Sequence, residues 1–317
     1  MNKFKKLGLT ALAGSLAVTS AVAGELSVSG GASLGVANTS NSAGHVTGKA
    51  WTMGNSVTFT GSGELDNGLN VSVSFELDQG AGAGVTSATD TGKPFDSHSL
   101  TVSSDELGTL KFSGHGGDSA QGAIDGTAAG DLWDAGTGVS GNVASAASEN
   151  NMMHYTLPSI VDDLTIAASY TPHATNDSHT SYAFTYSGVE GLTVNYGKGD
   201  SGAPGSEITS TTMKATYAVG SFTLGVSNTE ADKTGASDRE VTSYGITYTV
   251  SDDLSIGYGQ ETFDREGATV DEETRGYNVS YTTGGMTLGA AFNEGEGLNH
   301  TAGSTQERWK LTASFAF

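Results

Sequence analysis

Cysteine is absent from the 317 residues, which excludes disulfides, thiolate metal sites and thiol catalysis. Charged residues are also few, at 15%, against about 25% in typical soluble proteins. Only 14 Lys and Arg accompany 35 Asp and Glu, which gives a net charge of −21. This charge argues against a nucleic-acid partner, because phosphates are bound by clustered Lys and Arg side chains. After residue 23 no apolar run reaches the length of about 20 residues that a spanning helix needs, so a chain that spans a membrane must do so as a β-barrel.

The first 23 residues have the pattern of a signal peptide. Lys3, Lys5 and Lys6 form a basic start, residues 7–18 an apolar stretch, and Ala21-Val22-Ala23 a small-residue cleavage site. A membrane anchor would need about 20 apolar residues and a stop-transfer flank, and both are missing here. We therefore predict an exported protein with a signal peptide at 1–23 and a mature domain at 24–317. The mature chain loses three Lys and no acid, so its formal charge is 11 − 35 = −24.

The sequence contains repeated alternation of apolar and polar residues, and its last nine residues show this best. Every second one, from Trp309 to Phe317, is apolar, and three of the four between them are polar. Successive side chains of a strand point to opposite faces, so this pattern predicts a strand with one apolar face. Sixteen such segments recur, with apolar members within 26–36, 51–59, 69–77, 100–102, 110–112, 153–157, 164–170, 182–186, 192–196, 213–219, 222–226, 244–250, 254–258, 277–281, 286–292 and 309–317.

The composition of the apolar faces favours a membrane barrel. All eleven tyrosines fall on these faces, and no position assigned to them is charged; Asn55 is the only strongly polar member. A charge at mid-bilayer depth costs roughly 2–4 kcal/mol in such barrels, so its exclusion is expected. We predict an all-β, transmembrane antiparallel β-barrel of about 16 strands. The alternative, a soluble sandwich or a secreted adhesin, would favour Leu, Ile and Val over a face rich in Tyr.

The connections between the predicted strands alternate in length. Short turns are expected near 64–68, 104–108, 187–191, 219–221, 250–253 and 282–285. Long polar connections are expected near 37–50, 78–97, 114–150, 198–209, 228–239, 261–274 and 293–306. Short turns at one end and long loops at the other are typical of outer-membrane barrels.

Two strands and the C-terminus resemble Gram-negative general porins. Residues 107–114 (LGTLKFSG) resemble the strand before the third loop of that family, residues 150–158 (NNMMHYTLP) the strand after it, and Phe317 the terminal aromatic of the assembly signal. The resemblance implies a sixteen-stranded, usually trimeric, water-filled pore that an inward-folded third loop narrows. This chain departs from the family at His115 and His154, where arginines are frequent. A homotrimer also agrees with the smooth apolar face of residues 26–36 and with the lack of any tyrosine before residue 155.

The connection 114–150 is the longest and carries acids without Lys or Arg. Four aspartates, Asp118, Asp125, Asp131 and Asp134, are the candidates for the acidic side of the constriction. Alternation places Lys111, Lys214, Arg308 and Lys310 on the polar wall opposite. The alternative for the acidic stretch is a solvated surface loop. We predict a constriction with a preference for cations, because low-dielectric walls focus the field of such charges.

The sequence contains only weak matches to cofactor-binding and catalytic motifs. Residues 136–141 match a dinucleotide fingerprint without the strand that it needs before it, and residues 199–204 resemble a serine-protease loop without its partner residues. No cofactor is expected, and the scattered loop carboxylates leave weak Ca²⁺ binding open. The predicted function is passive diffusion of small hydrophilic solutes and ions across the outer membrane of a Gram-negative bacterium, with lipid and the solutes as partners. A substrate-specific channel, a barrel enzyme and a structural adhesin remain as alternatives.

Overall fold

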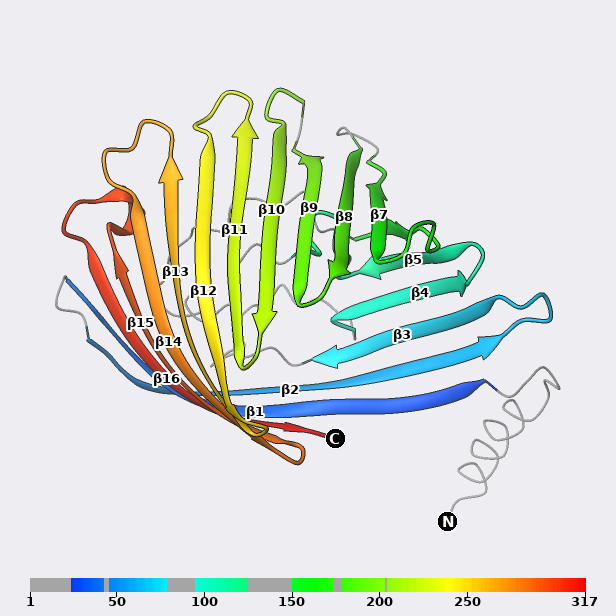
Figure 1. The fold of residues 1–317 in the computed structure, drawn as a ribbon, viewed down its shortest axis with the longest axis horizontal. Coiled ribbons are helices and arrows are strands. Elements are labelled where there is room, and N and C mark those ends of the chain that lie inside the picture. The colour runs from blue at the N-terminus through cyan, green and yellow to red at the C-terminus, as the bar shows by residue number, and fades with distance from the viewer. Residues whose placement is uncertain (1–23, 43–45, 79–94, 125–149, 174–177, 203) are drawn as a thin grey trace, which may run out of the picture.

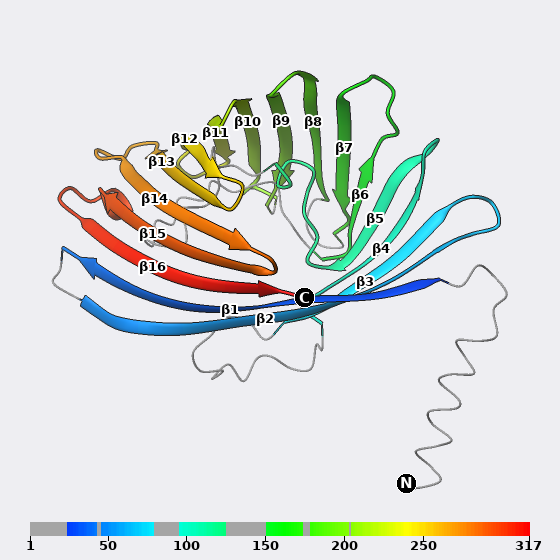
Figure 2. The same cartoon turned by 60° about the horizontal axis from the view of Figure 1, so that its bottom comes forward.

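The computed structural model describes residues 24–42, 46–78, 95–124, 150–173, 178–202 and 204–317. Within these ranges sixteen antiparallel strands close into one barrel, in which each strand pairs with its neighbours in sequence and the last pairs with the first (Figures 1 and 2). The strands are β1 (Glu25–Asn41), β2 (Val46–Glu64), β3 (Asn70–Asp78), β4 (Ser97–Ser104), β5 (Gly108–His115), β6 (Met152–Thr156), β7 (Leu164–Thr171), β8 (His179–Val189), β9 (Leu192–Ser201), β10 (Ile208–Val219), β11 (Phe222–Lys233), β12 (Arg239–Ser251), β13 (Leu254–Arg265), β14 (Glu272–Thr283), β15 (Met286–Glu296) and β16 (Thr305–Ala316). The prediction of an all-β antiparallel barrel is confirmed, with a strand at each of the sixteen predicted segments.

The C-terminus closes the barrel. β16 pairs with β1 from Gly31↔Ala316 to Asn41↔Gln306. One residue further, the Gly30 amide donates to the Phe317 carbonyl (2.9 Å) and the Phe317 amide donates to the Gly30 carbonyl (3.0 Å). A Cβ at Gly30 would lie 2.9 Å from Cε2 and Cζ of the Phe317 ring, so glycine provides the space in which this ring lies. The ring itself is 74% exposed, so its packing within the barrel is slight.

The outer face of the barrel is apolar through most of its height. Cross-strand pairs on β11 and β12 show the pattern: Phe222 faces Tyr248, with ring centroids 4.7 Å apart, and Val226 faces Tyr244. These side chains are exposed, as are Leu, Val, Met and Tyr residues at alternate positions of the other strands. An exposed apolar surface that encircles a protein would aggregate in water, so it requires an apolar medium around it. Among the described residues no helix has the length and apolarity that a membrane span requires.

The inner face carries small polar residues instead of a conventional core. The described residues buried on it are mostly Ser and Thr, including Ser210, Thr212, Ser227 and Ser243. Their hydroxyls contact one another across strands, as in the 2.6 Å pair of Ser227 and Ser243. Only two small clusters of buried apolar residues occur among the described residues: Ala231, Val241 and Phe263, and Ala120, Ile124 and Ala183.

Five of the seven predicted long connections are shorter in the structure, and the first of them, predicted at 37–50, is limited by β1, which ends at Asn41, and β2, which begins at Val46. The predicted loops 198–209, 228–239, 261–274 and 293–306 are too long, because strand pairing continues and leaves only 202–207, 234–238, 266–271 and 297–304 outside the strands. The extensions lose the apolar pattern because their outward positions are acidic. We call this set the outer acidic row: Glu230, Asp232, Glu240, Asp264, Glu273, Glu294, Glu296 and Glu307 on β11–β16.

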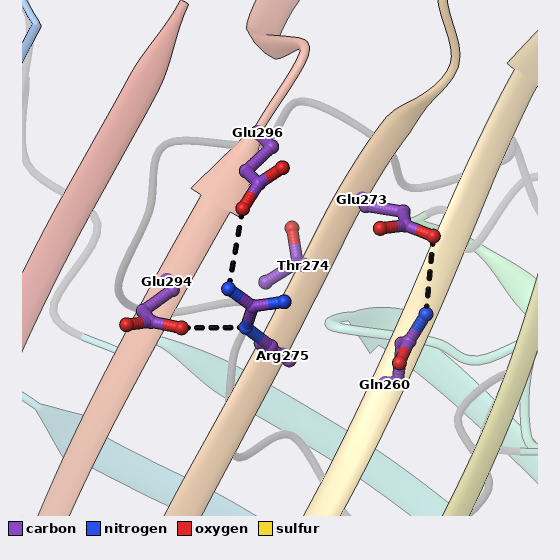
Figure 3. A pocket seen from close by; sticks show the side chains of 6 residues that line it. All are labelled: Gln260, Glu273, Thr274, Arg275, Glu294 and Glu296. Atoms are coloured by element: carbon purple, nitrogen blue, oxygen red, sulfur yellow. Dashed lines mark hydrogen bonds and ion pairs between the residues drawn. The ribbon is translucent and has the colours of Figure 1, made fainter.

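One base lies within the outer acidic row. Arg275 Nε donates to Glu294 (2.5 Å) and Nη2 to Glu296 (3.2 Å), while Gln260 donates to Glu273 (3.2 Å) (Figure 3). Tyr244 and Tyr258 donate their hydroxyls to Gln260 Oε1, which joins this network to the aromatic residues next to it on the outer face. On β14–β16 the outer face changes from apolar to charged within two residues, as from Phe292 to Glu294, whereas on β11–β13 polar residues such as Asn228 and Gln260 lie between. This change indicates where the apolar surroundings of the barrel end at the loop side.

Candidate functional site

The candidate functional site is the inner face of the barrel, which lines its lumen. The bases predicted to lie there are all on the face opposite the exposed apolar residues: Lys111 follows the outward Leu110, Lys214 follows Met213, and Lys310 precedes Leu311. They do not form one group, because they come from β5, β10 and β16. Only Arg308 and Lys310, two positions apart on β16, lie close together on this face.

Sequence reasoning missed three further bases of the inner face in the part of the chain that the structure describes. Lys233, Arg239 and Arg265 lie on the strand extensions that the sequence predicts as loops, and Arg239 and Arg265 are direct cross-strand partners. Each base lies two residues along its strand from a buried inward residue: Lys233 from Ala231, Arg239 from Val241 and Arg265 from Phe263. The three bases therefore continue the inward alternation. Continuing the period-2 pattern beyond the last outward apolar residue is the signal that would have found them.

Two buried acids also lie on the inner face near these bases. Glu261 and Glu272 are 4% and 2% exposed. Glu272 Oε1 lies 3.7 Å from Nε2 of His300, whose Nδ1 is 2.9 Å from the Val270 carbonyl oxygen. His300 ends the short 3₁₀ helix η1 (Leu298–His300), so these contacts hold the connection between β15 and β16 against β14.

Of the four candidate aspartates, one lies in the described part of the chain. Asp118 is exposed, and its carbonyl oxygen is 3.1 Å from Nδ1 of His154 on the inner face of β6. Asp125, Asp131 and Asp134 lie outside the described residues, as does most of the connection 114–150. The inward fold of that whole loop therefore stays a prediction.

The described start of this connection lies against the inner wall. The Ala120 amide donates to Ser169 Oγ on β7, and the Gln121 amide donates to Ser181 Oγ on β8 (3.0 and 3.2 Å). Both serines alternate with outward tyrosines, Tyr170 and Tyr182, so they point into the lumen. Figure 2 shows this segment, between β5 and its grey continuation, within the ring of strands.

The two histidines that replace the family's arginines have different positions. His154 lies on the inner face beside the start of the loop. His115 pairs across strands with His98, their rings are stacked with centroids 6.5 Å apart, and its Nδ1 contacts the Asp96 carbonyl oxygen. His98 in turn pairs with Phe75 of β3, which belongs to the outward alternation. Of the two, His154 is the one placed to affect ions in the lumen.

The protease-like motif begins on β9, where its aspartate is hydrogen-bonded to the neighbouring strand β8. In the protease-like stretch 199–204, Asp200 accepts hydrogen bonds from the amide and hydroxyl of Thr180, both at 2.7 Å. The dinucleotide-like stretch 136–141 lies outside the described residues. Within the described ranges no group of three or more His, Asp or Glu side chains is arranged to hold a metal ion. Weak Ca²⁺ binding by loop carboxylates stays a prediction.

A closed sixteen-stranded barrel with an apolar outside and a polar inside is the architecture of an outer-membrane pore. Residues 8–268 match the model of a protein family described as Gram-negative porin, and the chain belongs to that family. The family implies an outer-membrane location, and its members are typically channels without enzymatic activity. No curated protein matches the sequence significantly.

Solved porins share the fold at low sequence identity. Salmonella typhi OmpF, in a complex with daunomycin, has a TM-score of 0.71 and 13% identity, over 93% of this chain and 98% of that one. The trimer form of OmpT from Vibrio cholerae has a TM-score of 0.66 and 17% identity, over 93% and 99%. An anion-selective porin from Comamonas acidovorans has a TM-score of 0.66 and 15% identity, over 93% and 100%. This fold thus occurs in an anion-selective porin, so the fold alone does not indicate a preference for cations.

Proposed function

We propose that the protein is a general diffusion porin, through which small hydrophilic solutes and ions pass the outer membrane without chemistry. The observation that carries this is the closed barrel whose inner face is lined with Ser, Thr and charged residues while its outer face is apolar. Water fills such a lumen because its wall offers hydrogen bonds. Family membership supports the same function.

A planar bilayer tests the proposal. The purified protein should form long-lived channels whose conductance rises in proportion to the conductivity of the KCl solution, because a wide aqueous pore does not saturate with ions. A substrate-specific channel would instead show conductance that saturates or is blocked by its solute. Absence of channels from correctly folded protein would contradict the proposal.

The distribution of tyrosines supports a general rather than a specific channel. All eleven tyrosines belong to outward positions of the strands, so none offers a stacking surface for a sugar in the lumen. Of the described inward bases, Lys233, Arg239 and Arg265 lie on the adjoining strands β11–β13 and Arg308 and Lys310 lie on β16, while Lys111 and Lys214 lie apart on β5 and β10. The seven bases therefore do not form one continuous ladder. These observations favour passage by size and charge.

Cation preference belongs to the proposal, and it depends on the acids of the connection 114–150. The outer acidic row does not count toward it, because those carboxylates face away from the lumen. Asp118 and the three aspartates beyond it are the acids proposed to lie beside the ion path, with Lys111 and His154 on the adjoining wall. We also propose that residues 1–23 are a signal peptide, cleaved on export.

We propose a homotrimer, with β1–β3 and β16 facing the neighbouring subunits. Ala32 lies at the centre of the smooth outer face of β1, opposite Phe315 of β16 and Asn55 of β2. A bulky residue there would prevent close packing of subunits. The trimeric OmpT structure supports this assembly for the fold.

Ala32→Trp is expected to convert trimer into folded monomer, as measured by cross-linking and mild-detergent electrophoresis. Ala168→Trp is the matched control, because Ala168 occupies the outer face of β7 between Ile166 and Tyr170, on the far side of the barrel. Tryptophan is tolerated at a lipid-facing site, so the control should remain trimeric. A wild-type protein that is monomeric, or trimers in both variants, would contradict the proposed interface.

A further inference from the structure

The turn Asp118–Ile124, which follows β5, is built into the inner wall by its own set of contacts. It curls back on itself, because the Gly122 amide donates to Ser119 Oγ (2.9 Å) and the Ala123 amide to the Ser119 carbonyl (2.8 Å). Ser119, Ala120 and Gln121 are almost fully buried although they belong to a connection. Exposed loops seldom bury three consecutive residues, so this turn is a fixed part of the wall.

The wall supplies the hydrogen-bond partners that the turn needs. Ser169 Oγ and Ser181 Oγ lie 2.7 Å apart and accept the amides of Ala120 and Gln121. The Gln121 side chain then extends to β10, where its Nε2 donates to Thr212 Oγ1 (2.7 Å), itself 3.0 Å from Thr229 Oγ1 on β11. Four strands of this wall, β7, β8, β10 and β11, are thereby linked to one turn.

The strand β9, which lies between β8 and β10, provides the space that the turn occupies. Gly197 lies under the turn, and a Cβ there would be 2.8 Å from Ile124 Cδ1 and 3.1 Å from both Cα and Cγ of Gln121. The apolar side of the turn, Ala120 and Ile124, packs on Ala183 and Ala167. Small residues on the wall therefore let the turn lie flat against it instead of projecting into the lumen.

We propose that Gln121 and Gly197 are positioning residues that set the open width of the pore, by holding the turn Asp118–Ile124 in the plane of the wall. The inference rests on the proposed diffusion function and deepens it, because it names what fixes the free cross-section. A Cβ at position 197 requires Cα and Cγ of Gln121 to move by a few tenths of an ångström, since carbon atoms pack no closer than about 3.5 Å. The further methyl groups of a valine require a larger shift of the turn toward the lumen. Loss of the side-chain amide of Gln121 removes the hydrogen bond from Nε2 to Thr212 that links the turn to β10.

Three variants test the inference in planar bilayers, with the full-length protein reconstituted after extraction. Gly197→Val should lower the single-channel conductance and shift the reversal potential in a KCl gradient, because the turn and Asp118 move into the ion path. Gln121→Leu keeps the bulk without the amide and should give unsteady current with a lower mean. Ala291→Val is the matched control, since Ala291 lies on the inner face of β15, opposite Lys310 and away from the turn.

The outcomes separate this inference from the proposed function. A conducting wild type together with wild-type conductance and reversal potential in Gly197→Val and Gln121→Leu overturns the positioning role alone. A wild type without channels overturns the diffusion function itself. Equal loss of conductance in Ala291→Val would also overturn the inference, because any β-branched residue added to the inner wall would then act alike. If Gly197→Val fails to assemble, Gln121→Leu decides: normal steady current in it overturns the inference, and unsteady current supports it.

Discussion

Deletion of Phe317 is expected to reduce the amount of protein in the outer membrane by about tenfold or more. The ring contributes little to packing, since it is 74% exposed, and full burial of a Phe is worth only about 1.5–3 kcal/mol. The deletion also removes the two main-chain hydrogen bonds to Gly30 that complete the β1–β16 seam. In a bilayer each unpaired main-chain group costs several kcal/mol, because lipid offers no substitute for it.

Two substitutions separate the contribution of the ring from that of the main chain. Phe317→Ala keeps both hydrogen bonds to Gly30, whereas Phe317→Tyr keeps an aromatic ring as well. If the terminal aromatic is part of the assembly signal, as the porin resemblance implies, Phe317→Ala should lose most of the outer-membrane protein and Phe317→Tyr should lose little. Immunoblots of outer-membrane fractions measure this. Wild-type levels in the deletion variant would contradict both the sealing role and the signal.

Replacement of Asp118, Asp125, Asp131 and Asp134 by Asn together is expected to abolish or reverse the proposed cation preference of the pore. One uncompensated unit charge at about 6 Å, at an effective dielectric constant near 40, is worth about 1.4 kcal/mol, or roughly tenfold in local ion concentration. Charges more than about 8 Å from the path are screened at physiological salt, so only acids beside the narrow part matter. The reversal potential in a KCl gradient measures the change.

The outer acidic row offers a control of equal charge. Replacing Glu230, Glu240, Glu294 and Glu296 by Gln also removes four negative charges, but from side chains that face away from the lumen. This variant should keep the wild-type reversal potential. An anion-selective wild type, or equal shifts in the two quadruple variants, would show that the aspartates of the connection do not line the path of the ions.

The sequence is sufficient to predict the barrel because one period governs it. Every second residue faces lipid, and a lipid-facing position such as Leu224 or Tyr248 must be apolar or aromatic whatever its neighbours are. The alternation predicts sixteen strands from such positions, and all sixteen exist. It does not predict where strands end at the loop side. Glu230 and Glu240 are direct partners in the ladder, yet their charges are typical of a loop.

The candidate site is less accessible to sequence reasoning, because its contacts join segments far apart in the chain. Gln121 and Thr212 are 91 residues apart, and no local pattern pairs a glutamine in a loop with a threonine on a strand. His115 shows the same limit: a shift in register between β4 and β5 places it beside His98. Alternation counted along β5 alone does not reveal such a shift, since it depends on the partner strand.

The strand extensions make the upper wall of the barrel electrically two-sided. On adjacent residues of β12 and β13, Glu240 and Asp264 point outward while Arg239 and Arg265 point inward, separated only by the thickness of one sheet. Such a wall acts as a transverse dipole layer, with its positive side toward solutes that enter and its negative side toward the membrane surroundings. At this height many of the acids lie on the exterior, while the inner side holds Arg239 and Arg265 together with Glu261 and Glu272, so the net charge alone does not predict the ion preference of the channel.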